Sequence, residues 1–229
     1  MIILAMDTSS VNATVAVCNE YKLLGEYTIS CERAHSQIIM PLLDDLLERC
    51  SIKVNDIDVF AVALGPGSFT GLRIGIAAMK TLAQTLGKKI VGVSSLDSIA
   101  ASFLSDDNYI CPIIDARRNE AYNAVYYNGQ KIIEDRICDV DDILIEMRDK
   151  KVIFAGDGLI RYREKIEKYN NGNWRIAPVN VSMQKASGVA AVALERALKN
   201  DFDELDDVLP VYIRLSQAER EYNDAHGIK

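Results

Sequence analysis

The spacing of apolar residues predicts that the chain opens with three strands and a helix. Three segments are apolar or rich in β-forming residues and are separated by turn residues: Ile2–Met6, Val11–Cys18 and Lys22–Ile29. Short turns between consecutive strands indicate an antiparallel meander. From His35 to Arg49 the apolar residues follow the helical period instead. Pro41 lies inside this pattern and should bend or restart the helix, because proline cannot donate to the carbonyl four residues back.

A glycine-rich stretch follows the next apolar run. Val59–Leu64 is short and apolar, residues 65–75 read Gly-Pro-Gly-Ser-Phe-Thr-Gly-Leu-Arg-Ile-Gly, and helix formers continue to Leu86. This order predicts a buried strand, a tight turn and a helix. Glycines at such a junction can leave amide N–H groups free to hold an anion, but the spacing fits neither the dinucleotide fingerprint nor the P-loop. A tightly packed turn and a ligand loop, the latter with Gly65 and Gly67 as binding residues, are therefore both open.

Both predicted helices carry more apolar surface than one sheet needs. Their apolar residues span roughly 200° of the helical wheel, about twice the stripe of a surface helix. Such an excess indicates either a large core or a protein interface, and we favour the interface. The residues expected to form it are His35, Ile39, Leu42, Leu43, Leu46, Leu72, Gly75, Met79 and Leu82.

The opening pattern returns after a polar linker at residues 105–108. Three strand-like segments are again followed by a helix, a strand and a helix: Tyr109–Ile114, Glu120–Tyr127, Lys131–Ile137, Asp141–Arg148, Val152–Ala155 and Leu159–Tyr169. Two βββαβα units in tandem predict a duplicated α/β fold with mixed sheets. We expect an N-terminal lobe of residues 1–104, a C-terminal lobe of 105–213 and a tail of 214–229. The second lobe should also contain a strand near 174–177, a helix over 185–198 and a strand at 211–214.

Composition and charge narrow the class of protein. The chain has 229 residues, 49% of them hydrophobic and 26% charged, which is typical of a globular protein. Its net charge of -7 argues against a protein that binds nucleic acid unaided, because such binding depends on Lys and Arg. Neither a signal sequence nor an apolar run long enough for a membrane helix is visible, so a cytoplasmic protein is expected.

Cysteine and histidine are too sparse for a disulfide framework or a metal centre. The five cysteines include no C-x-x-C pair, and only His35 and His226 could supply imidazole ligands. We expect reduced thiols and no metal site within the chain.

The glycine string, together with Lys80, resembles the signature of the TsaB family, also called YeaZ. Other segments match that family in order: Leu4–Ser9, Ala34–Ser36 with Pro41, Gly92–Leu96, Asp115–Arg117 and Pro210–Arg214. The resemblance covers nearly the whole chain. It implies the actin-like ATPase (ASKHA) architecture, in which two ribonuclease-H-like lobes are joined. It also implies a non-catalytic accessory subunit of the bacterial machinery that makes threonylcarbamoyladenosine in tRNA.

The resemblance further implies the partners. The helices Ser36–Arg49 and Leu72–Leu86 would pack against a TsaD-like paralog in a four-helix contact, and would form a homodimer when the paralog is absent. A TsaE-like ATPase would assist, and tRNA would be bound only through the complex. No cofactor is expected on the isolated chain, since ATP and metal would be supplied through the partner subunits.

The loops offer weak candidates for nucleotide chemistry. In active proteins of this architecture, Asp7 would hold a water or a magnesium ion, and the turn with Thr8 and Ser9 would wrap phosphates. That turn lacks both glycine and lysine, and the equivalent turn with Arg117 lacks glycine. We therefore interpret both turns as relics of nucleotide-binding loops. His35 lacks the second histidine that a TsaD-like metal site carries four residues further on.

Two alternatives to the accessory subunit are open. One is an enzyme, either an actin-like nucleotide-dependent phosphotransferase or a glycoprotease-like peptidase, although no Ser-His-acid set supports peptide cleavage. The other is a dimeric scaffold with no link to tRNA.

Overall fold

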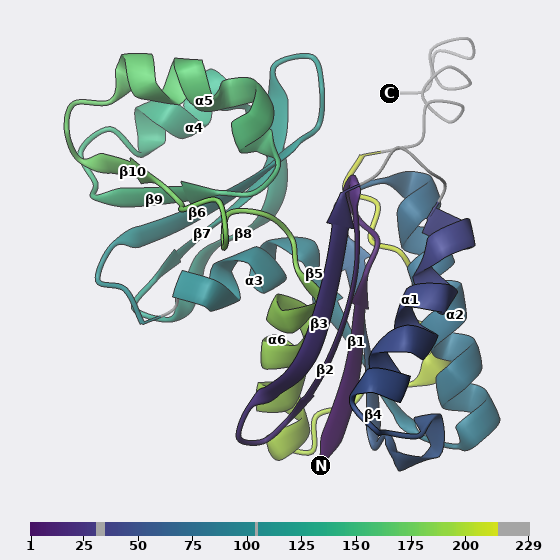
Figure 1. Cartoon of the computed structure of the whole chain (residues 1–229). Coiled ribbons are helices and arrows are strands. Elements are labelled where there is room, and N and C mark those ends of the chain that lie inside the picture. Colours follow the sequence, from purple (N-terminus) through teal and green to yellow (C-terminus); the bar gives the residue numbers. More distant parts are fainter. Residues whose placement is uncertain (31–34, 104, 215–229) are drawn as a thin grey trace, which may run out of the picture.

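The first lobe is built on a five-stranded mixed sheet. The computed structural model describes residues 1–30, 35–103 and 105–214 (Figure 1). In this lobe the strand order is β3-β2-β1-β4-β5, with β1 antiparallel to β2, β2 antiparallel to β3, and β1, β4 and β5 mutually parallel. The predicted opening meander is therefore confirmed. The strands are β1 (Ile2–Asp7), β2 (Asn12–Asn19), β3 (Leu23–Ser30), β4 (Val59–Gly65) and β5 (Lys89–Ser94).

The second lobe repeats this topology. Its strand order is β10-β9-β6-β7-β8, so β6 occupies the central place that β1 has in the first sheet. The pairings β6–β7 and β7–β8 are antiparallel and β6–β9–β10 are parallel. The predicted duplication is confirmed. The strands are β6 (Tyr109–Asp115), β7 (Glu120–Tyr127), β8 (Gln130–Asp139), β9 (Val152–Ala155) and β10 (Trp174–Ile176).

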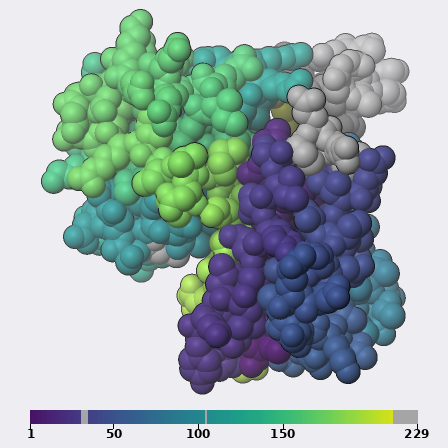
Figure 2. Space-filling model, viewed as in Figure 1, coloured from purple at the N-terminus to yellow at the C-terminus, as the bar shows by residue number. Residues whose placement is uncertain are grey.

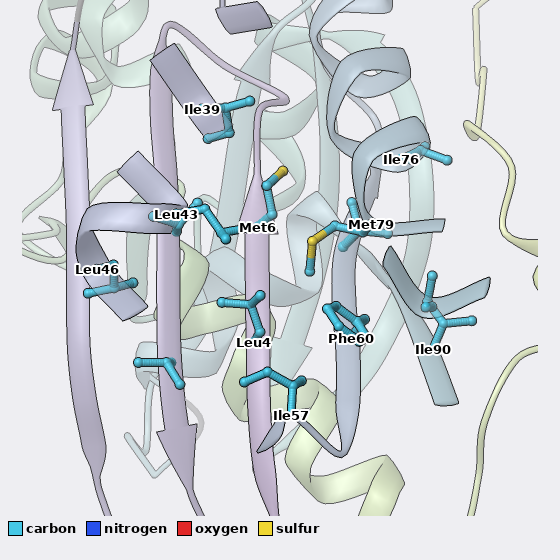
Figure 3. Packing of buried hydrophobic residues seen from close by; sticks show 14 of the residues in the cluster. Leu4, Met6, Ile39, Leu43, Leu46, Ile57, Phe60, Ile76, Met79 and Ile90 are labelled. Carbon is cyan, nitrogen blue, oxygen red and sulfur yellow. The ribbon is translucent and has the colours of Figure 1, made fainter. Parts of the chain in front are cut away.

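Two long helices cover the outer face of the first sheet. The helix α1 (His35–Arg49) runs continuously through Pro41, so the predicted restart there is not seen. The helix α2 (Phe69–Leu86) begins where the Ser68 hydroxyl accepts a hydrogen bond from the Gly71 N–H, and it ends at Gly87 in the left-handed conformation. Figure 3 shows apolar side chains of both helices, among them Leu43 and Met79, packed with Met6 of β1 and Phe60 of β4. This helix pair and the sheet together enclose the largest apolar core.

The second lobe has its own shorter helices. α4 (Val140–Glu146) and α5 (Gly158–Tyr169) pack on one face of its sheet, and their apolar residues form a core with β6, β9 and Trp174. Two single turns of 3₁₀ helix, η1 (Val54–Asp56) and η3 (Leu205–Asp207), complete connections in the first lobe.

Each lobe lends one helix to the other. The helix α3 (Ser95–Ala100), extended by η2 (Ala101–Phe103), follows β5 but packs on the second sheet. The helix α6 (Ala186–Leu198) follows β10 but covers the inner face of the first sheet with a small-residue surface. The two helices contact each other between the sheets (Figure 1). Figure 2 shows the two lobes lying side by side in the same view. Each of these two helices therefore packs on the sheet of the other lobe, and sequence order does not reveal that the chain crosses over twice.

The lobe junction is also tied by charged groups. Asp97 on α3 accepts a hydrogen bond from the Tyr126 hydroxyl at 2.5 Å, and its carboxylate lies 2.7 Å from the Lys131 ammonium on β8. Ser94, at the end of β5, donates to Asp135 at 2.5 Å. These contacts fix the second lobe against the carboxyl end of the first sheet.

The predicted strand at 211–214 is wrong. These residues lie in no strand, although the Val211 N–H donates to the Leu64 carbonyl at 2.8 Å. The segment instead crosses the start of α2 and reaches the second lobe, where the Arg214 guanidinium donates to the Ala116 carbonyl at 2.6 Å. Of the predicted tail, only Arg214 belongs to the described residues, and Leu104 also lies outside them.

Candidate functional site

The glycine-rich loop after β4 is filled by the turn that follows β1. The Ser68 N–H donates to the Ser9 carbonyl at 2.7 Å, and the Thr8 hydroxyl donates to the Gly71 carbonyl at 2.7 Å. Thr8 and Ser9 are both buried. The Ser68 N–H and the Thr8 hydroxyl, two groups that could otherwise bind a phosphate, are therefore engaged within the chain.

The glycines of this loop are required by that contact. A Cβ atom on Gly67 would lie 2.4 Å from the Ser9 carbonyl oxygen, and one on Gly71 would lie 2.0 Å from the Thr8 carbonyl oxygen. A Cβ on Gly75 would lie 2.5 Å from the Thr8 hydroxyl oxygen. Since no side chain fits at these separations, the close approach of α2 to the turn explains the glycines. Between the two interpretations of the string, the structure favours the tightly packed turn.

Asp7 is fully buried beneath this turn. Its Oδ1 accepts a hydrogen bond from the Ser9 N–H at 2.7 Å, while its Oδ2 and the nearby Ser9 hydroxyl have no partner among the described residues. Burial raises the pKa of the Asp7 carboxyl, because desolvation disfavours the charged form, and the hydrogen bond from the Ser9 N–H only partly offsets this.

The equivalent turn of the second lobe has a different character. Arg117, Arg118 and Asn119 all have positive φ angles, of 64°, 54° and 64°. The Arg117 N–H donates to Asp115 Oδ1 at 2.8 Å, and the same oxygen accepts from the Tyr162 hydroxyl at 2.9 Å. Both arginine side chains are exposed. Asp115 and Asp7 thus end equivalent strands, but only the second turn presents charge to solvent.

A third carboxyl, on Asp157, lies near the second turn. Its Oδ1 accepts from the Asp115 N–H at 3.2 Å. Burial raises the pKa of Asp157 to about 6, and the charges of Asp115 and Asp7 act in the same direction. Gln184, also fully buried, has no hydrogen-bond partner for its amide among the residues described.

Within residues 1–30, 35–103 and 105–214, no three His, Cys, Asp or Glu side chains are placed to hold a metal ion. Gly65 is buried and a Cβ on it would meet the Val211 carbonyl oxygen at 3.0 Å, so that side of the loop is covered too. The glycine loop is therefore closely packed on the sides that face Ser9 and Val211.

Most of the predicted interface residues belong to the chain's own core. Five of them are 0–3% exposed, and Gly75 is buried against Thr8, so their side chains offer no surface to a partner. This part of the prediction is corrected, because the two helices cover one whole face of a five-stranded sheet and need a broad apolar surface to do so. The five are Ile39, Leu43, Leu46, Leu72 and Met79.

The remaining predicted interface residues are half-buried. Leu42 and Leu82 lie at the margin of the core, and His35 Nε2 lies 3.2 Å from the Asn12 carbonyl oxygen. His35 thus holds the start of α1 to β2.

A stripe on α2 lies partly open to solvent, and of its five residues the sequence analysis named only Leu82. Ala77 and Thr81 are exposed, and Ile74, Ala78 and Leu82 are half-buried. Their spacing of i, i+3, i+4, i+7 and i+8 places them on one side of the helix, which we call the α2 outer stripe. The stripe contains no charged residue. The signal was available in the sequence, since these positions adjoin the buried ones on the helical wheel, but small residues such as Ala77 drew less weight than the leucines.

The fold defines a class of protein. A solved structure titled YeaZ from Pseudomonas aeruginosa matches with a TM-score of 0.78 over 92% of this chain and 99% of that chain, at 24% identity. Component A of (R)-2-hydroxyglutaryl-CoA dehydratase from Acidaminococcus fermentans matches with a TM-score of 0.56 over 86% of this chain and 99% of that one, at 12% identity. The chain has the actin-like ATPase (ASKHA) fold that the resemblance implied.

Sequence comparison then gives the family. The chain is 32% identical to the tRNA threonylcarbamoyladenosine biosynthesis protein TsaB of Bacillus subtilis, over 97% of this chain and 98% of that protein. The TsaB of Haemophilus influenzae is 26% identical over 93% of each. Residues 22–222 also match the family described as TsaD, tRNA N6-adenosine threonylcarbamoyltransferase. The chain belongs to the TsaB (YeaZ) family of tRNA threonylcarbamoyladenosine modification. Among the helices described, none is both long and apolar enough to span a bilayer.

Proposed function

We propose that this chain is a non-catalytic subunit that binds a TsaD-like paralog and supports transfer of a threonylcarbamoyl group to the adenosine next to the anticodon of tRNA. The observation that carries the proposal is the α2 outer stripe. Ile74, Ala77, Ala78, Thr81 and Leu82 form an uncharged helical surface that the rest of the described chain leaves partly open to solvent.

The composition of this stripe favours another helix as its partner. Alanine and threonine at i, i+4 spacing allow two helix axes to approach closely, and the flanking Ile74 and Leu82 supply apolar area at each end. A paralog with the same fold would present an equivalent helix pair. In its absence a second copy of this chain would fill the same surface, giving a homodimer through an isologous contact.

The first-lobe turn supports a role without nucleotide chemistry of its own. Thr8 and Ser9 occupy the space beside the glycine loop, and Asp7 is buried with its charged form disfavoured. ATP and metal would then be bound by the partner subunits, and a TsaE-like ATPase would assist the complex. The complex as a whole would bind the tRNA.

A matched pair of substitutions tests the surface. Ala77→Arg places a long charged side chain on the exposed stripe, whereas Ala191→Arg makes the same change at an exposed position of α6 on the far side of the first sheet. We expect Ala77→Arg to abolish co-elution with a TsaD-like protein in size-exclusion chromatography and to abolish tRNA modification in the mixture. Both variants should keep the thermal unfolding midpoint of the parent.

The same experiment can contradict the proposal. If Ala77→Arg binds the paralog as well as Ala191→Arg does, the α2 outer stripe is not the contact. Tight binding of ATP by the purified chain alone, measured by calorimetry, would favour the alternative of an actin-like nucleotide-dependent enzyme.

A further inference from the structure

An aromatic pair is exposed where the C-terminal segment crosses α2. The rings of Phe69 and Tyr212 stack with centroids 4.7 Å apart and an interplanar angle of 23°. The Arg73 guanidinium lies 3.9 Å from the centroid of the Phe69 ring and donates from Nε to the Tyr212 hydroxyl at 2.9 Å. Phe69 is 40% exposed and Tyr212 is 41% exposed. Large aromatic rings are thus held in a fixed orientation at the surface.

The segment that carries Tyr212 is held at both ends. On the first lobe, the Val211 N–H donates to Leu64, and the Lys80 ammonium donates to the Val208 carbonyl at 3.1 Å. On the second lobe, Arg214 donates to the Ala116 carbonyl at 2.6 Å and pairs with the Glu120 carboxylate. Because Ala116 immediately precedes Arg117, these contacts bring the aromatic pair and the arginine turn of the second lobe to the same side of the molecule.

The arginine turn retains its positive charge. Among the described residues, Arg117 and Arg118 make no ion pair, and the carboxylates of Asp115 and Glu120, which flank the turn in sequence, are already engaged. Asp115 accepts hydrogen bonds from Tyr162 and from the Arg117 N–H, and Glu120 is paired with Arg214. The surface at this turn is therefore positively charged, although the chain as a whole has a negative net charge.

The backbone of the turn does not favour arginine at these two positions. A left-handed conformation costs a side-chain-bearing residue roughly 1–2 kcal/mol relative to the right-handed one, and glycine avoids that cost. Arg117 and Arg118 both adopt it, with φ angles of 64° and 54°. An unfavourable conformation retained at two consecutive arginines indicates a use for their side chains.

We propose that Phe69, Arg73, Tyr212, Arg117 and Arg118, which we call the aromatic–arginine cluster, contact unpaired nucleotides of the tRNA substrate. Bases stack on exposed aromatic rings, and arginines bind the phosphates between them. The cluster provides both features on an otherwise acidic chain. This proposal deepens the proposed function, because it gives this subunit a direct part in holding tRNA within the complex.

The test measures RNA binding with two double variants. The probe is a fluorescein-labelled tRNA anticodon stem-loop, and its anisotropy is followed with the chain mixed with a TsaD-like protein and, at low ionic strength, with the chain alone. Arg117→Gly with Arg118→Gly removes two charges while relieving the positive-φ conformation. Phe69→Leu with Tyr212→Leu removes the stacking surface but keeps the segment apolar. We expect each double variant to weaken RNA binding roughly tenfold or more.

A matched control separates this surface from charge in general. Arg148→Ala with Arg175→Ala also removes two exposed arginines, but from the opposite end of the second lobe, beyond α4 and on β10. We expect this control to bind RNA nearly as the parent does. The Arg117→Gly, Arg118→Gly variant should also show a shallower dependence of binding on salt, by roughly 1.4 in the logarithmic slope, if both arginines meet single-stranded phosphates.

Three outcomes would overturn the proposal. The first is RNA affinity in both cluster variants equal to that of the control. The second is loss of co-elution with the TsaD-like protein in the cluster variants, which would assign the cluster to a protein contact. The third is absence of RNA binding by the parent in both settings. If the parent forms no complex with the paralog, the proposed function fails, and the affinity of the chain alone then decides the RNA proposal.

Discussion

The two turns that follow β1 and β6 occupy the same place in their lobes but have opposite characters. The first, at Thr8–Ser10, is buried, uncharged and hydrogen-bonded to the glycine loop. The second, at Ala116–Asn119, projects two arginines into solvent on a left-handed backbone. Both follow a strand that ends in aspartate. A duplicated fold therefore does not duplicate the use of its loops, since the first has become part of the core and the second remains available for binding.

The largest change in stability is expected from a substitution beside the first turn. Gly71→Ala would place a Cβ atom 2.0 Å from the Thr8 carbonyl oxygen, a backbone atom that cannot move without displacing β1. We expect a loss of about 3 kcal/mol in the free energy of unfolding, as in overpacked cores. Urea titration followed by circular dichroism measures it. Thr70→Ala, one residue earlier and exposed, should leave the midpoint nearly unchanged. Equal stability of the two variants would show that the turn is not packed as described.

The same contact shows how far the sequence could predict the site. The order of strands and helices followed from the periods of the apolar residues, and the duplication followed from the repetition of that order. The glycine string was recognised as a strand-to-helix turn. The sequence did not predict that the turn after β1 packs against this string. The contact joins Thr8 to Gly71, 63 positions apart, and the local pattern around either residue gives no information about the other.

Several of the residues predicted for the interface lie in the core for a related reason. Leu43, Leu46 and Met79 are more apolar than Ala77 or Thr81, so apolarity alone assigned them to the interface. A helix that covers a five-stranded sheet turns its largest side chains inward, so smaller neighbours such as Ala77 and Thr81 lie at the surface. The crossover of α3 and α6 likewise left no trace in the sequence, because both helices look like continuations of the lobe before them.

A second, intermediate effect concerns pH. The pKa of Asp157 is raised to about 6 by burial, above its model-peptide value of about 3.9. The folded state therefore holds this proton more tightly than the unfolded state, and the contribution of Asp157 to stability falls as pH rises from about 4 to about 6. Asp157→Asn removes that dependence, and we expect the variant to be more stable than the parent at pH 7 by on the order of 2 kcal/mol. Its Oδ1 can still accept from the Asp115 N–H.

Chemical denaturation at pH 4.5 and at pH 7 measures this difference. The parent should lose more stability between the two pH values than Asp157→Asn does. Asp149→Asn, at an exposed position of the same lobe, is the control and should follow the parent. A pH dependence in Asp157→Asn as steep as that of the parent would show that another group is responsible.

The smallest change in stability is expected at the second turn, where it tests whether the arginine side chains or the backbone account for the sequence. Arg118→Gly relieves a φ angle of 54°, and the gain is partly offset by the greater freedom of glycine in the unfolded chain. We expect a stabilisation of up to about 1 kcal/mol, seen as a higher midpoint in differential scanning calorimetry. Arg148→Gly removes an exposed arginine from a residue without a positive φ, so it should lower the midpoint instead. Since glycine is unfavourable at one turn position and favourable at the other, opposite signs in these two variants would show that Arg118 is retained against the preference of its own backbone. A lower midpoint in both would mean that the arginine stabilises the turn, and the argument for binding would lose its support from the backbone.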